Sequence, residues 1–344
     1  MPQIHMDNMI KEHPILSIQN LKTYFHQDEG VVKAVDGASF DVFSGRTLGV
    51  VGESGCGKSV TARSILQIVD KGGAIEGGEI LLRRPNGSQV DEVDLTKLDP
   101  NSKQMRSIRG DEVALIFQEP MTSFSAFHTV GNQIIEAIRI HKDISKKEAR
   151  EEAIELLRLV GIPQPDRRID EYSFQLSGGL RQRVMIAMAL SSDPKVLIAD
   201  EPTTALDVTT QAQVLDLLRT LQEEKGLAII LITHDMGVIA EMADDVVVMY
   251  LGRVVEKGPV DEIFHAPKHP YTRLLLQSIP SIFAEPRTKL ATISGSIPHP
   301  YNRPQGCPFH PRCPDFMPGT CDVHEPTLQQ ENKSQSVSCF LYSK

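Results

Sequence analysis

The residue types best suited to chemistry gather at positions 52–59, where an apolar run leads into the spacing G-x-x-x-x-G-K-S and then into a helix-favouring segment. A strand that enters a turn of small residues and then a helix directs backbone N–H groups at one point, which suits a phosphate. Lys58 is then placed for the terminal phosphates and the Ser59 hydroxyl for Mg²⁺. This spacing predicts a nucleoside triphosphate site rather than a glycine-rich turn with a chance lysine. The expected contact residues are Gly52, Ser54, Gly55, Cys56, Gly57, Lys58, Ser59 and Val60.

Polar side chains with catalytic potential follow two further apolar runs. Asp200 and Glu201 close the run at residues 195–199, an unusual place for two adjacent carboxylates. Beside a triphosphate, Asp200 would hold Mg²⁺ opposite Ser59, and Glu201 would act as general base on the attacking water. His234 follows the run at residues 228–232 and would contact the terminal phosphate or that water. The alternative for all three is an ordinary solvated strand end.

A second glycine-containing turn precedes an apolar helix at residues 176–183. Ser177 is a suitable N-cap, and Gly178 and Gly179 leave the helix N-terminus open to a phosphate. The chain thus has one complete phosphate loop but two helix starts able to bind an anion. This is explained if the second serves a nucleotide held by another subunit, with a simple capped helix as the alternative.

The surrounding pattern predicts an α/β fold whose sheet is mainly parallel and covered on both faces. Residues 15–41 alternate around a turn at 28–30 and predict antiparallel strands, with Tyr24 and Phe25 at the end of the first. After the phosphate loop a helix is expected from Ser59 to Val69. A helical block at about residues 120–183, with a capping box at Ser145 and Glu148, interrupts the α/β pattern.

Composition narrows the class of protein. The net charge of −9 argues against a dedicated nucleic-acid binder. No apolar run is long enough to span a bilayer and the start is polar, so a soluble, cytosolic chain is expected, able to dock on a membrane protein. Thirteen of the 22 prolines lie from Pro259 onward and predict a loop-rich C-terminal extension. Four of the five cysteines also lie there, which favours a metal site over disulfides in a cytosolic protein.

Together these motifs resemble those of the ATP-binding-cassette (ABC) ATPases, over about residues 15–264. The resemblance implies a P-loop NTPase with an antiparallel β subdomain and an inserted helical subdomain. The corresponding motifs are Walker A at 52–59, the Q-loop residue Gln118, the signature at 176–179, Walker B at 196–200, the catalytic Glu201, the D-loop at 205–207 and the switch residue His234. One departure is Leu180, where most of the family has glutamine; a working site is still expected.

The resemblance also implies how the site works. Phe25 corresponds to the aromatic residue that stacks on adenine, while Lys58, Glu201 and His234 are the catalytic residues. Cassettes act as head-to-tail dimers in which ATP lies between one subunit's Walker A and the other's signature residues Ser177, Gly178 and Gly179. Gln118 is then both a Mg²⁺ ligand and the hinge that couples the γ-phosphate to the partner. The implied Mg²⁺ ligands are Ser59, Gln118 and Asp200.

The segment after residue 264 resembles the tail of oligopeptide and dipeptide importer ATPases, from His269-Pro270-Tyr271-Thr272 onward. The spacing C-x5-C-x7-C-x17-C indicates only a thiolate metal site. Some importer ATPases carry a [4Fe–4S] cluster there, so the resemblance implies one at Cys307, Cys313, Cys321 and Cys339. Structural Zn²⁺, with His310 or His324 as substitute ligands, is the alternative, and unliganded cysteines are the third.

The sequence therefore predicts a nucleotide-binding domain at residues 14–264 and an importer extension at 265–344. The expected function is ATP hydrolysis that drives di- or oligopeptide uptake, by a peripheral protein on the cytoplasmic face of the membrane. The expected partners are a second ABC ATPase, most simply a paralogue, two transmembrane permeases and an extracytoplasmic solute-binding protein, with no nucleic acid. The alternatives are another solute such as nickel, a cassette ATPase of DNA maintenance, and a nucleotide-binding regulatory subunit with little turnover.

Overall fold

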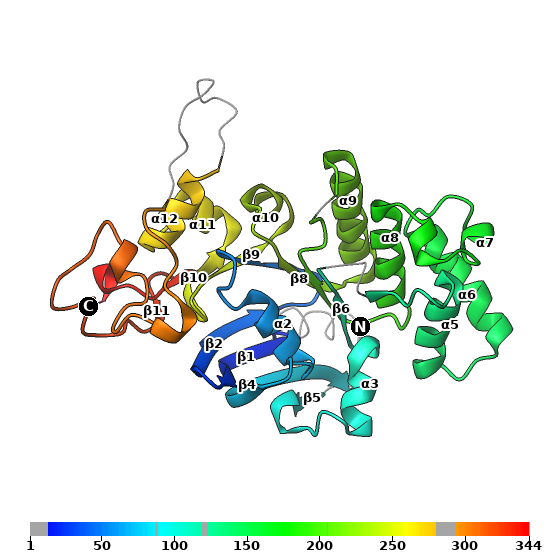
Figure 1. The fold of residues 1–344 in the computed structure, drawn as a ribbon, viewed down its shortest axis with the longest axis horizontal. Helices are drawn as coiled ribbons and strands as arrows, with labels where there is room; N and C mark the ends of the chain where they lie inside the picture. The colour runs from blue at the N-terminus through cyan, green and yellow to red at the C-terminus, as the bar shows by residue number, and fades with distance from the viewer. Residues whose placement is uncertain (1–12, 87–88, 119–122, 205, 280–292, 344) are drawn as a thin grey trace. The chain divides into compact units, whose positions relative to one another are not determined.

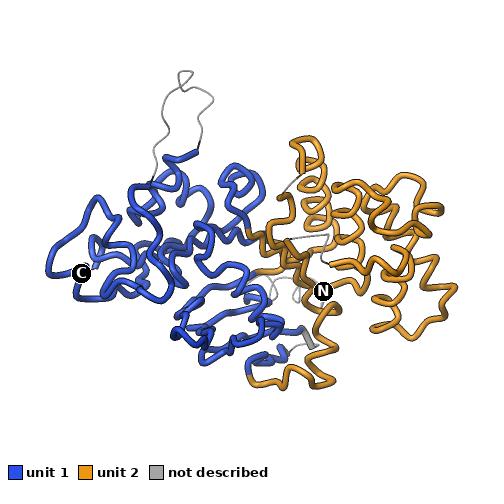
Figure 2. Tube along the Cα trace, in the orientation of Figure 1, with its two compact units in different colours: residues 1–42, 47–96, 233–344 blue, residues 43–46, 97–232 orange. Residues whose placement is uncertain are grey.

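The computed structural model describes residues 13–86, 89–118, 123–204, 206–279 and 293–343. The chain divides into two compact units, which Figure 2 shows in different colours. Unit 1 contains residues 1–42, 47–96 and 233–344, and unit 2 contains residues 43–46 and 97–232. Each unit is assembled from segments far apart in the sequence. The phosphate loop and His234 lie in unit 1, and Gln118, the signature turn and Glu201 lie in unit 2.

Unit 1 contains a four-stranded antiparallel sheet in the order β2-β1-β4-β5. Its strands are β1 (Leu16–Gln27), β2 (Gly30–Val42), β4 (Gly73–Asn86) and β5 (Gln89–Asp94), as seen in Figure 1. The expected N-terminal antiparallel strands are therefore confirmed. Buried aliphatic side chains of β1, β2 and β4 form one face of this sheet, as their alternating sequences require.

A second group of strands in unit 1 has the order β11-β12-β10-β9-β3. β3 (Thr47–Val51) is buried throughout and runs parallel to β9 (Asp245–Tyr250), which pairs antiparallel with β10 (Arg253–Pro259). The described part of unit 1 also has short strands and α-helices: β11 (Gln329–Gln330), β12 (Ser336–Val337), α2 (Lys58–Ile65), α10 (Met236–Met242), α11 (Val260–His265) and α12 (Pro270–Gln277).

Unit 2 contains three parallel strands in the order β8-β7-β6. These are β6 (Val113–Ile116), β7 (Val196–Asp200) and β8 (Ala228–Ile232), and β7 and β8 are buried along their whole length. The helices are α3 (Lys103–Asp111), α5 (Val130–His141), α6 (Lys146–Leu159), α7 (Pro165–Arg168), α8 (Gly178–Ala189) and α9 (Val208–Lys225), of which α5 to α8 form the helical block (Figure 1). The capping box of Ser145 and Glu148 at the start of α6 is confirmed.

Two local expectations differ from the structure. Helix α2 ends at Ile65 rather than Val69, because Gln67 adopts a left-handed conformation (φ 50°) that no α-helix continues through. Helix α3 was not anticipated, since its polar sequence has few apolar positions; only Met105 and Ile108 are buried. Within the described residues, no helix is long and apolar enough to cross a membrane.

Candidate functional site

The turn between β3 and α2 has the backbone of a phosphate loop. Gly52, Gly55 and Gly57 have φ values of 150°, 78° and 104°. A Cβ on Gly52 would lie 2.2 Å from the carbonyl oxygen of Met249, and one on Gly57 would lie 2.3 Å from that of Ala34. Neighbouring backbone therefore lies in close contact with the turn at both ends, and only glycine fits at these positions.

Lys58 lies inside this loop although it is the first residue of α2. Its Nζ donates to the carbonyl oxygens of Gly52 (2.7 Å) and Glu53 (3.2 Å), and the side chain is buried. Gly57, the N-cap of α2, supplies no side-chain hydrogen bond to the first turn of the helix. The loop thus presents a cation and a helix N-terminus that no side chain caps, the combination that binds phosphate.

His234 lies in the same unit, immediately after Thr233. The backbone N–H of Thr233 donates to the carbonyl oxygen of Val50 (3.3 Å), two residues before the loop begins. The side chain of His234 is exposed, and Asp235 after it caps helix α10. The structure therefore brings His234 to the end of β3 from which the phosphate loop departs.

The two aromatic residues at the end of β1 have different surroundings. The Tyr24 hydroxyl donates to Asp36 (2.6 Å), and burial together with this carboxylate raises the pKa of Tyr24 to about 12. Phe25, next along the strand, points to the other face. A Cβ on Gly73 would lie only 2.7 Å from Cε1 of Phe25, so this glycine makes room for the ring. Tyr24 is thus bonded to a carboxylate that also pairs with arginines, whereas Phe25 takes no part in that network.

In unit 2, the carboxylates at the end of β7 occupy different environments. Asp200 is the last residue of the strand and only 5% exposed. Glu201 leaves the strand with φ 48°, and its Oε2 accepts hydrogen bonds from Gln118 Nε2 (3.0 Å) and Thr204 Oγ1 (2.9 Å). The structure thus joins Gln118 and Glu201, which are far apart in the sequence and were predicted separately. The contact with Thr204 was missed, and no sequence signal indicated it.

The signature turn is exposed and locally stabilised. Ser177 caps α8 by accepting a hydrogen bond from the backbone of Leu180 (3.4 Å), as expected. A Cβ on Gly178 would meet no atom within 4 Å, whereas one on Gly179 would lie 2.5 Å from Cγ2 of Thr210. Gly179 therefore allows α8 to approach α9, while Gly178 faces open space. Of the D-loop, Ala205 lies outside the described residues, and Asp207 caps α9.

The four C-terminal cysteines influence one another electrostatically. The backbone N–H of Cys307 donates to the carbonyl oxygen of Cys321 (2.8 Å). Burial raises the pKa of Cys307 and of Cys313 to about 11, and Cys321 and Cys339 contribute to both increases. Burial also raises the pKa of Cys339, with a contribution from Cys321. Across the described ranges, no group of three or more His, Cys, Asp or Glu residues is arranged to hold a metal ion.

The sequence did not reveal that the C-terminal segment contacts the phosphate loop. The Tyr271 hydroxyl accepts a hydrogen bond from the backbone N–H of Glu53 (2.8 Å), and Arg312 forms two hydrogen bonds with the Glu53 carboxylate. These partners lie 218 and 259 positions from Glu53. No local pattern encodes a pairing at this separation.

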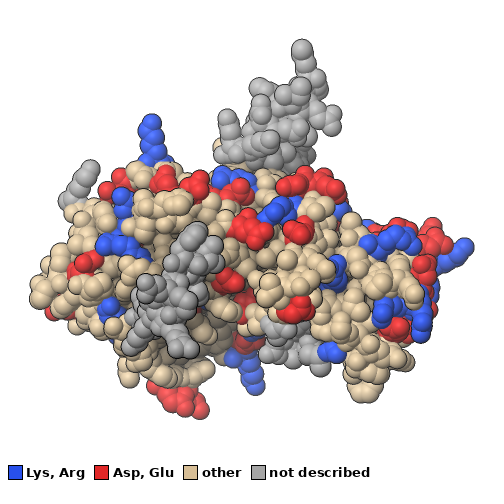
Figure 3. Space-filling view, turned by 90° about the horizontal axis from the view of Figure 1, so that it is seen from above, with Lys and Arg blue, Asp and Glu red and all other residues tan. Residues whose placement is uncertain are grey.

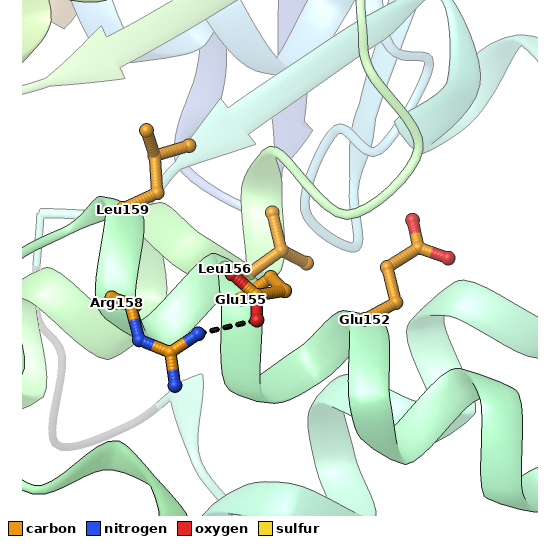
Figure 4. Close-up of a pocket in the computed structure, with 5 residues that line it drawn as sticks. All are labelled: Glu152, Glu155, Leu156, Arg158 and Leu159. Atoms are coloured by element: carbon orange, nitrogen blue, oxygen red, sulfur yellow. Dashed lines mark hydrogen bonds and ion pairs between the residues drawn. The ribbon is translucent and has the colours of Figure 1, made fainter.

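Two surface hollows lie outside these motifs. One, of about 420 Å³, is on α6, where Arg158 pairs with Glu155 beside Leu156 (Figure 4). The other, of about 540 Å³, is in unit 1, where Arg253 and Arg303 pair with Asp36. The arginines in both are paired with carboxylates, so we assign neither a ligand. Acidic and basic side chains are also interspersed over the face of the molecule shown in Figure 3.

Comparison with known proteins gives consistent results. The ABC transporter family model matches residues 35–204, and that of the oligopeptide/dipeptide transporter C-terminal region matches residues 255–321. The oligopeptide transport ATP-binding protein AppD of Bacillus subtilis is 50% identical, covering 96% of this chain and 97% of that protein. The dipeptide transport ATP-binding protein DppD of Escherichia coli is 44% identical, covering 94% of this chain and 96% of that protein.

Solved structures agree with this fold. The dimeric structure of the bacterial ABC transporter cassette MJ0796 matches with a TM-score of 0.62 and 26% identity, over 71% of this chain and 98% of that one. A post-hydrolysis structure of the same cassette, bound to ADP and Pi, matches equally well. Fold and site therefore define an ATP-binding cassette: an α/β P-loop ATPase with an antiparallel N-terminal sheet and a helical insertion. Within that class, the chain belongs to the family of ATP-binding subunits of oligopeptide and dipeptide ABC transporters.

Proposed function

We propose that this chain hydrolyses ATP to drive the import of di- or oligopeptides through two partner permeases, at the cytoplasmic face of the membrane. A second cassette subunit, most simply a paralogue, and an extracytoplasmic solute-binding protein would complete the importer. The proposal is supported by relatives named as oligopeptide and dipeptide transport proteins and by the match to their C-terminal region. Residues 14–264 would form the cassette and residues 265–344 the importer extension.

The phosphate loop is the part of the chain that would bind the triphosphate. The observation that carries this proposal is the position of Lys58, whose Nζ lies on the loop carbonyls of Gly52 and Glu53 at the start of α2. On binding, Lys58 would exchange these carbonyls for phosphate oxygens, and the loop N–H groups would hold the remaining oxygens. Phe25 would stack on adenine.

Mg²⁺ would be held by oxygen atoms of Ser59, Gln118 and Asp200. Hydroxyl, amide and carboxylate oxygens are ligands suited to this hard cation, so the residues fit it. When bound, it neutralises charge that develops on the phosphates. Asp200 suits this role because it is a buried residue, 5% exposed, at the end of strand β7.

Glu201 would orient and deprotonate the attacking water, with His234 on the same water or on the γ-phosphate. Two hydrogen bonds, from Gln118 and Thr204, support this role because they fix the carboxylate of Glu201 in one orientation. Movement of Gln118 on ATP binding would alter that orientation, which would link hydrolysis to the Q-loop. Gln118 is thus both sensor and hinge in this proposal.

The second half of each ATP site would come from the partner cassette. The exposure of Ser177 and Gly178 supports this, because the start of α8 is available to a phosphate from outside the chain. The ATP sandwich would close when both subunits bind nucleotide and reopen after hydrolysis. That cycle would move the attached permeases.

The test is Glu201→Gln in the assembled transporter. We expect ATP binding to persist and turnover to fall by about 100-fold or more, since general-base catalysis contributes about 10²–10⁴-fold. ATP binding is measured by nucleotide titration and turnover by phosphate release. The matched control is Glu224→Gln, an exposed glutamate on α9, for which both should be unchanged. Unchanged turnover in Glu201→Gln would remove Glu201 from the mechanism.

The solute is tested by uptake. Cells with the chain should accumulate a labelled dipeptide or oligopeptide, and cells with Lys58→Ala should not. Uptake of nickel without peptide would assign the alternative solute. Absence of both, together with co-purification of DNA rather than of two integral membrane proteins, would favour a cassette of DNA maintenance. Unchanged uptake in the Lys58→Ala strain would contradict an ATP-driven role for this subunit.

We also propose that Cys307, Cys313, Cys321 and Cys339 hold a [4Fe–4S] cluster. Four cysteines are the ligand set of such clusters, and a backbone hydrogen bond joins two of the four, Cys307 and Cys321. The described residues do not form a ready-made group of three or more metal ligands, so the four thiols would converge only on binding. Buried thiols with a raised pKa ionise readily only when a cation compensates the charge. The cluster would cross-link a proline-rich segment that has little core of its own.

The cluster is tested on protein purified without oxygen. We expect a brown preparation with about four iron atoms per chain, and loss of both in Cys307→Ser. One zinc atom per chain and no colour would assign the alternative, with His310 or His324 as a substitute ligand. In that case His310 would bind through Nε2, since its Nδ1 lies 2.9 Å from the carbonyl oxygen of Cys307. Absence of any metal would contradict both assignments.

A further inference from the structure

Glu53, the residue after the first glycine of the phosphate loop, is held by residues of the C-terminal segment. Its backbone N–H donates to Tyr271 Oη at 2.8 Å. Its carboxylate accepts from Arg312 Nη1 at 2.7 Å and from Nη2 at 3.0 Å, a bidentate pair. All three residues belong to unit 1. Charge-assisted pairs of this geometry are among the strongest hydrogen bonds that proteins form.

Arg312 is built into its position. Its side chain is 4% exposed, and the hydrogen bonds to Glu53 raise its pKa, so it is always charged. Nε donates to the carbonyl oxygen of Ser294 (3.1 Å) and Nη1 to Tyr250 Oη (3.3 Å). The guanidinium also lies 5.8 Å from the ring centroid of Tyr250. A buried arginine with every nitrogen engaged has few other orientations, so it determines where the Glu53 carboxylate lies.

Tyr271 is held with equal firmness. It is fully buried on α12, and its ring packs against Tyr250 (centroids 4.8 Å apart) and Phe309 (5.3 Å). The start of α12 is anchored by Glu256, which is completely buried and accepts hydrogen bonds from the backbone of Lys268 and His269. Burial raises the pKa of Tyr271 well above its usual range, so the hydroxyl stays protonated.

These contacts matter because of what the loop must do when it binds phosphate. Lys58 Nζ bridges the carbonyl oxygens of Gly52 and Glu53 and so holds the loop from inside. A bound phosphate competes for this ammonium group, and the loop then loses its internal tie. The bonds from Tyr271 and Arg312 reach Glu53 from the C-terminal segment and do not involve Lys58, so phosphate does not compete for them.

We propose that Arg312 and Tyr271 are positioning residues for ATP hydrolysis, through which the C-terminal segment keeps the phosphate loop in its ATP-binding shape. This inference rests on the proposed role of residues 52–59 as the phosphate site. Neither residue touches the nucleotide in this scheme; both act through Glu53. Loss of either bond lets the loop adopt other conformations. Part of the binding free energy of ATP is then used to order the loop, so ATP binds less tightly.

The experiment compares Arg312→Gln, Glu53→Gln and the double variant in the full assembled transporter. We expect each single variant to raise the KM for ATP about tenfold, with kcat changed less than about threefold, because the catalytic groups are intact. The double variant should be no worse than either single variant, since both remove one interaction. Arg312→Lys, which keeps the charge but not the bidentate geometry, should fall between wild type and Arg312→Gln. Tyr271→Phe should also raise KM, by a smaller factor.

Arg303→Gln is the matched control. Arg303 is another shielded arginine of the C-terminal segment, with 18% of its side chain exposed, and it pairs with Asp36 and Glu325 rather than with Glu53. We expect Arg303→Gln to lower the unfolding temperature without changing the KM for ATP. If Arg312→Gln behaves like Arg303→Gln, with lower stability and unchanged KM, the contact is only a structural link and the inference is wrong.

Two further variants, Glu53→Gln and Lys58→Ala, distinguish failure of the inference from failure of the proposed phosphate site. If Arg312→Gln does not fold, Glu53→Gln decides, because it breaks the same pair from the partly exposed side. Lys58→Ala, measured in parallel by nucleotide titration, tests the loop itself. Retained ATP binding in Lys58→Ala would overturn the proposed phosphate site. Lost binding there, with an unchanged KM in both Glu53→Gln and Arg312→Gln, would overturn only the inference about the C-terminal segment.

Discussion

The chain contains two glycine-containing turns that open helices, and they are held in opposite ways. The turn before α2 is pressed by the backbone of Ala34 and Met249 and tied at Glu53 by residues more than 200 positions away. The turn before α8 is capped by its own Ser177, and a side chain added at Gly178 would meet nothing. The first turn is constrained by distant segments at several points, whereas the second is capped by its own serine and meets another element at Gly179, which lies against Thr210.

This difference agrees with the proposed division of labour. A loop that surrounds phosphate must be ordered before the ligand arrives, because ordering at that moment weakens binding. A helix start that meets a nucleotide on another subunit must instead stay accessible. In this proposal the same physical device, a helix N-terminus, would serve as a fixed cradle in one place and as an open contact in the other.

The comparison is tested most strongly by adding one methyl group to each turn. Gly57→Ala should lower the free energy of unfolding by about 3 kcal/mol or more, because φ is 104° and the new Cβ would lie 2.3 Å from the Ala34 carbonyl oxygen. Gly178→Ala should change it by no more than about 0.5 kcal/mol. Urea unfolding of both variants measures the difference.

ATP turnover provides a second test of the contrast between the two turns. Gly178→Ala should fold normally and still lose turnover in the assembled transporter, since its methyl group would face the nucleotide of the partner. Equal destabilisation by the two substitutions would contradict the contrast between the turns. Full turnover in Gly178→Ala would contradict the assignment of α8 to the partner's site.

Acidification should lower the free energy of unfolding by a smaller amount, through His269. This histidine caps α12 by accepting a hydrogen bond from the backbone of Tyr271 (3.0 Å), and burial lowers its pKa to about 3. The unfolded chain takes up a proton near pH 6.5 and the folded chain does not. His269 therefore contributes stability that is present above pH 6.5 and lost as the pH falls toward 3.

His269→Asn retains an N-cap but cannot titrate. Between pH 6 and pH 4, the free energy of unfolding of the wild type should fall more steeply than that of the variant, by about 1.4 kcal/mol per pH unit. Urea unfolding at several pH values provides the measurement. Parallel curves would show that His269 takes up a proton in the folded protein.

The smallest effect is expected at the cap of the open turn. Ser177→Ala should cost about 1 kcal/mol or less, because its hydrogen bond to Leu180 is long at 3.4 Å. Ser145→Ala at the start of α6, which removes half of a complete capping box, should cost at least as much. Only Ser177→Ala should also reduce turnover in the assembled transporter. A loss of turnover in Ser145→Ala of the same size would remove the special role of Ser177.

Local patterns predicted much of the molecule. The alternation of residues 15–41 predicted β1 and β2, and the apolar runs before Gly52, Glu201 and Thr233 predicted three strands of the fold. These features depend on side-chain period and on glycine, both of which are visible in a short window of sequence. The early end of α2 was missed because the left-handed conformation of Gln67 leaves no mark on residue type.

The sequence by itself determined the chemistry of this protein: glycines where the backbone must turn sharply, a lysine beside them, and carboxylates at the ends of buried strands. Each of these depends on residue type at fixed spacing. Only the tertiary structure decided that Gln118 forms a hydrogen bond with Glu201 and that Arg312 and Tyr271 form hydrogen bonds with Glu53. Such pairings depend on how distant segments pack together, and the same arginine or tyrosine in another packing would meet a different partner.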